Sequence, residues 1–171
     1  PSQNPSSIFD HLIFLRIMIA FFRILTFLLI SVPTFCDLIP AKIVRVIDGD
    51  SVHVKKNESD YFVVRLFGID APELDQRFGR RSKKYLEKLT LNQSVKIQLF
   101  TKDNYGRQLA LIFDTAGRNI NLEMVQSGYA WVYQHYNPDP KWLGLQEQAK
   151  NGQLGLWQRS KPIPPWIFRR K

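Results

Sequence analysis

Residues 42–55 read KIVRVIDGDSVHVK, and this stretch carries two alternations of apolar and polar side chains. A period of two residues is typical of β-strands that bury one face. We therefore predict strands at 42–47 and 51–55, joined by a tight turn over 48–50, where an aspartate stands on each side of a glycine. Three further strands are predicted at 61–67, 95–100 and 108–113.

Helices are predicted where apolar residues recur at helical spacing, over 78–91, 119–126 and 138–151. The proline-rich tail 161–171 is predicted to be extended, with Trp166 as its anchor. Helices that follow the third and the fifth strand indicate a mainly β fold of the α+β class. We predict a five-stranded OB-fold barrel with about three peripheral helices, preceded by an N-terminal hydrophobic leader.

The leader is an apolar run over 12–36 that only Arg16 and Arg23 interrupt. Its uncharged piece, 24–36, would span ~20 Å as a helix, which is short of a hydrocarbon core of ~30 Å. That length favours a signal peptide over 1–36.

A true start at Met18 would give a compact export signal that is cleaved after Cys36. The domain would then cover 37–160, followed by a basic tail over 161–171, and the protein would be secreted or periplasmic. The alternative is an uncleaved helix within 12–36 that attaches the protein to a membrane, with the domain outside the cytoplasm.

The net charge of +9 favours a polyanionic partner, nucleic acid first and anionic lipid or cell-wall polymer second. The single cysteine, Cys36, excludes a disulfide and a cysteine-ligated metal within the domain. With only three histidines, a metal here would be held by oxygen atoms, which favours calcium or magnesium.

Charged residues interrupt or end apolar stretches in three motifs, DGDS at 48–51, RLFGIDAPE at 65–73 and DNYGR at 103–107. A charge beside a buried strand is costly unless it is paired or bound. Several such charges of both signs indicate a site.

These ordered motifs make the chain resemble the staphylococcal nuclease (thermonuclease) family over about 41–157. The closing Gly-Leu-Trp at 155–157 and Pro-Pro-Trp at 164–166 are similar to those of its exported bacterial branch. The resemblance implies that Asp50 and Asp70 are the carboxylates that bind calcium. It also implies catalytic roles for Arg65, Glu73 and Arg107.

Two positions depart from the family pattern. Ala71 stands where the reference enzyme has threonine, but the family uses the backbone carbonyl of this position as a metal ligand. Ser51 replaces a second threonine and keeps a hydroxyl. The stretch between Glu73 and the first helix is also shorter than in the reference enzyme.

Each assignment has a structural alternative. Asp50 and Asp70 would serve only as turn formers, as we expect of Asp48, and Glu73 would be a surface acid. Arg65 and Arg107 would be members of ordinary ion pairs. The set as a whole favours a site, because guanidinium groups offset phosphoryl charge and a carboxylate can orient or deprotonate water.

Three further residues are candidates for substrate binding. Tyr105 could donate a hydrogen bond to a phosphate, Lys102 could contact the substrate, and Tyr133 could stack on a base. Core packing is the alternative for the two tyrosines.

We therefore predict a monomeric, calcium-dependent phosphodiester hydrolase that acts on DNA and RNA, with magnesium or another hard divalent cation as the alternative metal. By the resemblance, water attacks phosphorus and leaves a 3′-phosphate and a 5′-hydroxyl. A catalytically silent OB module that binds nucleic acid is the first alternative function. A structural protein of the membrane or envelope is the second.

Overall fold

The computed structural model describes residues 38–136, 139–158 and 161–170. The predicted signal peptide, its cleavage after Cys36 and the membrane attachment through 12–36 lie outside these residues and stay predictions. Within the described ranges, every helix is too short or too polar to cross a bilayer.

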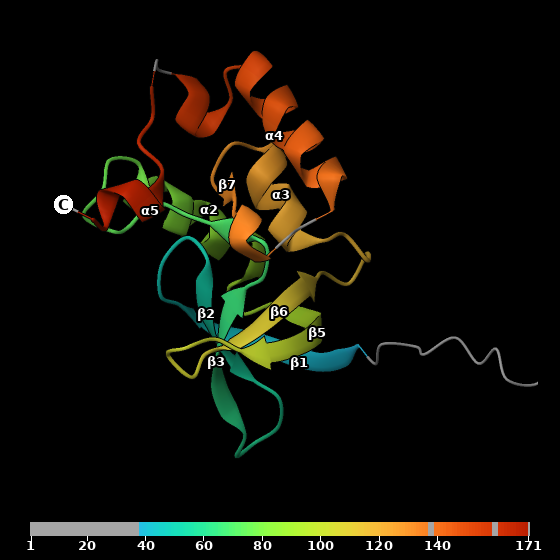
Figure 1. The fold of residues 1–171 in the computed structure, drawn as a ribbon. Coiled ribbons are helices and arrows are strands. Elements are labelled where there is room, and N and C mark those ends of the chain that lie inside the picture. Colours follow the sequence, from blue (N-terminus) through green and yellow to red (C-terminus); the bar gives the residue numbers. More distant parts are fainter. Residues whose placement is uncertain (1–37, 137–138, 159–160, 171) are drawn as a thin grey trace, which may run out of the picture. The chain divides into compact units, whose positions relative to one another are not determined.

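A closed barrel of five strands forms the base of the molecule (Figure 1), in the order β1-β2-β3-β6-β5. Its strands are β1 (Ile39–Val46), β2 (Ser51–Lys55), β3 (Tyr61–Leu66), β5 (Ser94–Lys102) and β6 (Gln108–Phe113). Neighbours pair antiparallel except β3 and β6, which pair parallel and close the barrel. The predicted OB-type barrel is confirmed.

Alternation along the strands fills the barrel interior. Val52, Val54 and Val64 are completely buried, as are Ile97 and Ile112 from β5 and β6. These side chains belong to one core cluster that continues into the helices. The burial of apolar area on this scale is the main stabilising contribution to a small domain.

Strand register sets the position of the first charged groups. Ser51 of β2 lies opposite Arg65 of β3, and Arg65 lies opposite Leu109 of β6. The backbone N–H of Leu66 donates to the carbonyl of Asp50 at 2.8 Å. The turn after β1 and the end of β3 are therefore held side by side at the barrel rim.

The helices gather beyond one end of the barrel (Figure 1). They are α2 (Gly79–Thr90), α3 (Ile120–Gln126), α4 (Pro140–Asn151) and the short α5 (Pro165–Phe168), with 3₁₀ turns η1 (Gln134–Tyr136) and η2 (Gly155–Gln158). Asn119 and Asp139 cap α3 and α4 through side-chain oxygens that accept backbone N–H groups. Three of these helices are at the predicted places.

A second, two-stranded sheet joins the barrel to the helices. Strand β4 (Ile69–Asp70) pairs antiparallel with β7 (Trp131–Val132), and the N–H of Tyr133 donates to the carbonyl of Gly68 at 2.9 Å. Gly68 has φ +77°, and a Cβ there would lie 2.7 Å from the Trp142 ring. Only glycine fits this turn, which brings Asp70 to the rim.

The tail departs from the prediction that it is extended. Residues 161–164 have no regular structure, but Pro165 then opens α5 and is buried. Proline suits the first position of a helix because its missing N–H has no partner there in any case. The Nε2 of Gln76 donates to the carbonyl of Ile163 at 2.7 Å, so the tail packs on the loop before α2.

Candidate active site

The turn between β1 and β2 presents Asp50 as a buried carboxylate. Its own N–H donates to Asp48 Oδ1 at 3.0 Å, so Asp48 shapes the turn. Ser51 Oγ donates to Asp50 Oδ1 at 3.1 Å, and the N–H of Ala71 donates to Asp50 Oδ2 at 2.6 Å. A Cβ on Gly49 would lie 2.2 Å from Ser82 Oγ, so glycine lets the turn pack closely on α2.

Arg65 bridges the two predicted metal carboxylates. Its Nη1 lies 3.1 Å from Asp50 Oδ2, and its Nη2 donates to Asp70 Oδ1 at 2.8 Å. Nη1 also donates to the carbonyls of Leu66 and Ile69, at 3.2 and 3.0 Å. All three charged side chains are buried, so the guanidinium is fixed in one orientation at the barrel rim.

The buried cluster holds two carboxyl groups and one guanidinium group. Burial raises the pKa of Asp50 to about 8, the Arg65 guanidinium works against that rise, and the charges of Asp48 and Asp70 add to it. Two buried carboxylates thus share one buried guanidinium. Such a site favours a further cation.

Glu73 lies on the loop after Asp70, and its side chain is partly exposed. Gln76 Oε1 accepts the N–H of Glu73 at 3.2 Å, and the N–H of Gln76 donates to the carbonyl of Glu73 at 3.0 Å. A Cβ on Gly79 would lie 1.7 Å from that carbonyl oxygen. The start of α2 therefore packs directly against the backbone of Glu73, and Gly79 is needed for this contact.

Arg169 was not predicted as a site residue, yet its guanidinium contacts two of the carboxylates. Nη2 donates to Asp70 Oδ2 at 2.7 Å, and Nη1 donates to Asp70 Oδ1 at 3.2 Å and to Glu73 Oε1 at 2.6 Å. Its hydrogen bonds to Asp70 and then to Glu73 raise its pKa above the ordinary value, so it is fully charged. In the sequence, the one feature that could have pointed to Arg169 is the basic end of the tail, Arg-Arg-Lys at 169–171.

Arg107 lies in a self-contained turn between β5 and β6. Its Nε donates to Asp103 Oδ2 at 2.8 Å, and its N–H donates to Asp103 Oδ1 at 2.9 Å. The N–H of Tyr105 also donates to Oδ1, and the guanidinium lies over the Tyr105 ring, 5.4 Å from its centre. The turn holds Arg107 at the rim through its own aspartate.

Two of the predicted substrate-binding residues, Lys102 and Tyr105, lie on the β5–β6 hairpin, and the third, Tyr133, follows β7. Tyr105 is 86 % exposed at the tip of its turn, and Lys102 is exposed at the end of β5. Tyr133 is half-buried after β7, with ring centres at 5.8 Å from Trp166 and 5.7 Å from His135. Tyr133 therefore packs against neighbouring rings and remains partly accessible to solvent.

The structure brings Asp50, Arg65, Asp70 and Ala71 into direct contact, and Arg169 links Glu73 to them. Among the described residues, no hydrogen bond or ion pair joins the turn 103–107 to these carboxylates. Nor does any group of three or more His, Cys, Asp or Glu side chains in those ranges form a metal cluster by itself. A metal would need ligands beyond side chains, as the prediction with the Ala71 carbonyl supposes.

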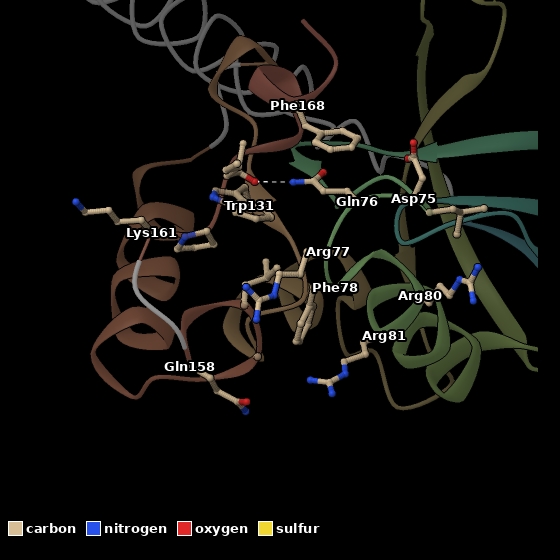
Figure 2. A pocket seen from close by; sticks show the side chains of 15 residues that line it. Asp75, Gln76, Arg77, Phe78, Arg80, Arg81, Trp131, Gln158, Lys161 and Phe168 are labelled. Atoms are coloured by element: carbon tan, nitrogen blue, oxygen red, sulfur yellow. Dashed lines mark hydrogen bonds between the residues drawn. The ribbon is translucent and has the colours of Figure 1, made fainter. Parts of the chain in front are cut away.

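A cavity of about 680 Å³ opens beside the Glu73 loop, between the start of α2 and the tail (Figure 2). Four basic side chains and one carboxylate, Asp75, line it together with aromatic rings. The basic residues are Arg77, Arg80, Arg81 and Lys161, and the rings are those of Phe78, Trp131 and Phe168.

A closed five-stranded barrel with a buried carboxylate–arginine cluster at its rim defines an OB-fold protein with a charged site at one end of the barrel. The family model described as "Staphylococcal nuclease homologue" matches residues 63–159. The chain belongs to the staphylococcal nuclease family. Arg65, Asp70, Glu73 and Arg107 lie within the matched range, and Asp50 precedes it.

Named relatives agree with this assignment. A protein of Escherichia coli O157:H7 named "Uncharacterized endonuclease" is 39% identical over 147 residues, 86% of this chain and 95% of that protein. A Haemophilus influenzae protein of the same name is 41% identical over 130 residues, 76% and 72% of the two chains. A "Micrococcal nuclease" of Shigella flexneri is 37% identical over 153 residues, 84% and 87% of the chains. These matches confirm the predicted family and support the prediction of a nuclease.

Proposed function

We propose that this protein is a calcium-dependent nuclease that hydrolyses phosphodiester bonds in DNA and RNA without selecting the sugar. The observation that carries the proposal is the buried bridge of Arg65 between Asp50 and Asp70, with Glu73 on the adjoining loop. Buried charges of both signs at a barrel rim cost stability unless they bind something. A divalent cation would bind the carboxylates, and a phosphate would bind the guanidinium.

The donors present fit a hard cation. Asp50 and Asp70 offer carboxylate oxygens, and the hydrogen bond from Ala71 to Asp50 places the Ala71 backbone beside them. We propose that these two side chains and the Ala71 carbonyl hold calcium, with magnesium as the alternative. The bound ion would polarise the phosphoryl group and lower the pKa of water.

The chain's own residues would perform the remaining steps. Glu73, partly exposed beside the buried carboxylates, would orient the attacking water and take its proton. Arg65 is held beside the proposed metal ligands, and it would donate to a phosphate oxygen once its carboxylate partners bind the cation. Arg107, held through Nε by Asp103, would offset the charge that builds on the phosphoryl group.

The substrate is proposed to be nucleic acid because the surroundings of the site are basic and aromatic. The cavity in Figure 2 offers four cations for backbone phosphates and rings for stacking. Tyr105, Lys102 and Tyr133, which lie outside this cavity, are proposed to contact other parts of the nucleic-acid strand. Affinity should fall steeply as salt concentration rises.

Cleavage assays test this function. The purified protein is mixed with single-stranded DNA, double-stranded DNA or RNA in calcium, magnesium or chelator. We expect cutting that requires calcium, and a loss of roughly 10²–10⁴-fold in rate for Glu73→Gln. Glu58→Gln is the matched control, because Glu58 is an exposed glutamate on the loop between β2 and β3, paired with Lys55.

The outcomes separate the proposed function from its alternative. Binding of nucleic acid without cutting in any metal would show a silent OB module. Cutting at the wild-type rate by Asp50→Ala in calcium would show that the metal site lies elsewhere.

Export of the protein is a separate proposal that rests on the apolar run 12–36. We expect secreted or periplasmic material to begin near Asp37, which N-terminal sequencing would determine. Material that keeps the run and remains with the membrane would support the anchored alternative.

A further inference from the structure

The C-terminal segment places a cation on Asp70, which the proposed metal would use, and on the neighbouring Glu73. Arg169 contacts both oxygens of Asp70 at 3.2 and 2.7 Å, and also Glu73 at 2.6 Å. The first of these oxygens already accepts from Arg65 at 2.8 Å. The second, Asp70 Oδ2, faces Arg169. A divalent cation on Asp70 would need the space that this guanidinium fills.

Other contacts seat the segment, so Arg169 does not depend on the carboxylates alone for its position. Gln76 holds the carbonyl of Ile163, and Pro165 is buried at the start of α5. The Trp166 ring lies 5.8 Å from that of Tyr133, centre to centre. The guanidinium can therefore leave the carboxylates while the segment remains attached.

The charges around Asp70 favour a contact with Arg169. Asp50, Asp70 and Glu73 bring three carboxyl groups together, and Arg65 contacts both of the buried ones, Asp50 and Asp70. Arg169 supplies a second positive charge from a side chain that remains about 43% exposed. An exposed, single-charge ligand binds less strongly than a divalent cation, so exchange between the two is feasible.

We propose that Arg169 is a tethered competitor of the metal: it occupies Asp70 and Glu73 until a divalent cation displaces it. The proposal rests on the metal site of the proposed function. Metal loading is then an exchange at Asp70, the carboxylate that Arg169 and the proposed metal share, and the C-terminal segment sets the metal concentration at which the site fills.

The size of the effect follows from the fraction of molecules in which the site is open. Apparent affinity falls in proportion to that fraction, so a segment that is closed nine-tenths of the time weakens metal binding about tenfold. High salt should reduce the difference, because the closed contact is partly exposed and is screened.

Titration of the full chain with calcium, measured by calorimetry in the absence of nucleic acid, tests the exchange. Arg169→Gln should bind calcium about tenfold more tightly than the wild type. Arg170→Gln is the matched control, because it removes the same charge one residue along. Arg170 lines a different surface hollow with Tyr133 and Trp166, and the control should bind as the wild type does.

Hydrogen exchange gives a second readout that does not depend on activity. The N–H groups of Phe168 and Arg169 donate to the carbonyls of Pro164 and Pro165. Calcium should speed exchange at these amides in the wild type, since Arg169 loses its carboxylate partners. In Arg169→Gln, calcium should leave the exchange rate of the amides at positions 168 and 169 unchanged. Arg169→Lys keeps the positive charge but loses the bidentate contact of a guanidinium, so it should bind calcium with intermediate affinity.

Several results would overturn the exchange. Equal or weaker calcium binding by Arg169→Gln would do so while leaving the metal site intact. Unchanged calcium binding together with lost cleavage would instead make Arg169 a third catalytic arginine. Absence of calcium and magnesium binding in every variant would overturn both this inference and the metal in the proposed function.

Discussion

Arg65 and Arg107 have the same predicted role, yet the molecule holds them in opposite ways. The Arg65 side chain is 7% exposed and bridges two carboxylates, one from the turn between β1 and β2 and one from strand β4. The Arg107 side chain is 32% exposed and pairs with Asp103, four residues earlier in its own turn. The first arrangement exists only when the barrel is folded, whereas the second is local.

This difference divides the site into two parts. The buried part consists of Asp50, Arg65 and Asp70, which β-sheet register holds in one geometry. The rim part consists of Glu73 and Arg107, which loops outside the barrel hold. A rigid part suits metal and phosphate positioning, and a looser rim suits groups that must meet an incoming strand.

The largest expected effect comes from Arg65→Gln. It leaves Asp50 and Asp70 buried without their shared partner, so we expect a loss of about 3–5 kcal/mol in the free energy of unfolding. Arg107→Gln should cost less than about 1 kcal/mol, because its pair is local and partly exposed. Urea unfolding in chelator measures both.

Both variants should lose cleavage activity, but for different reasons. Stability losses of similar size for Arg65→Gln and Arg107→Gln would contradict the division into a rigid and a loose part. Recovery of stability in Arg65→Gln on adding calcium would fit it, because the ion would replace the missing positive charge.

The barrel could be predicted because its strands alternate visibly. The predicted 51–55 and 108–113 are the observed bounds of β2 and β6. Strands β4 and β7 have two residues each, too few for an alternation to be seen. The tail was predicted to be extended from its prolines, but proline also starts helices, and α5 begins at Pro165.

The site could be predicted in its buried part, where charge beside apolar strands demands a partner. Sequence alone did not show that Arg107 would pair with Asp103, although both stand in one motif. Arg169 lies 99 residues from Asp70 along the chain, and no local pattern links two such positions. The roles assigned to all these residues stay predictions until variants are measured.

A smaller effect is expected from Gly79→Ala, which tests how the rim glutamate is held. The added Cβ would lie 1.7 Å from the Glu73 carbonyl oxygen, so the loop must move. We expect a loss of about 1–3 kcal/mol in stability and a fall in cleavage rate.

Gly144→Ala is the matched control, because Gly144 lies inside α4 and its Cβ would meet nothing within 4 Å. That variant should gain about 0.5–1 kcal/mol from helix propensity. If Gly79→Ala kept wild-type stability and activity, Glu73 would not depend on its contact with α2.

The smallest effect concerns the local pair at the rim. Partial burial works to raise the pKa of Asp103, but hydrogen bonds from the Arg107 side chain and from the N–H groups of Arg107 and Tyr105 outweigh it and lower that pKa. Asp103 therefore stabilises the fold above its ordinary pKa of 3.8, and this contribution is lost as pH falls through the lower, folded value.

Asp103→Asn should accordingly cost about 1 kcal/mol near pH 7, and the difference from the wild type should shrink below about pH 4. Unfolding curves across that range measure it, with Asp114→Asn as control, since Asp114 forms the same kind of turn with Arg118. A several-fold loss of cleavage in Asp103→Asn alone would show that the local turn aims Arg107 at the substrate. Equal cleavage by both variants would mean that Arg107 finds its position only when a phosphate binds, and the rim would then be looser than the distances at Asp103 imply.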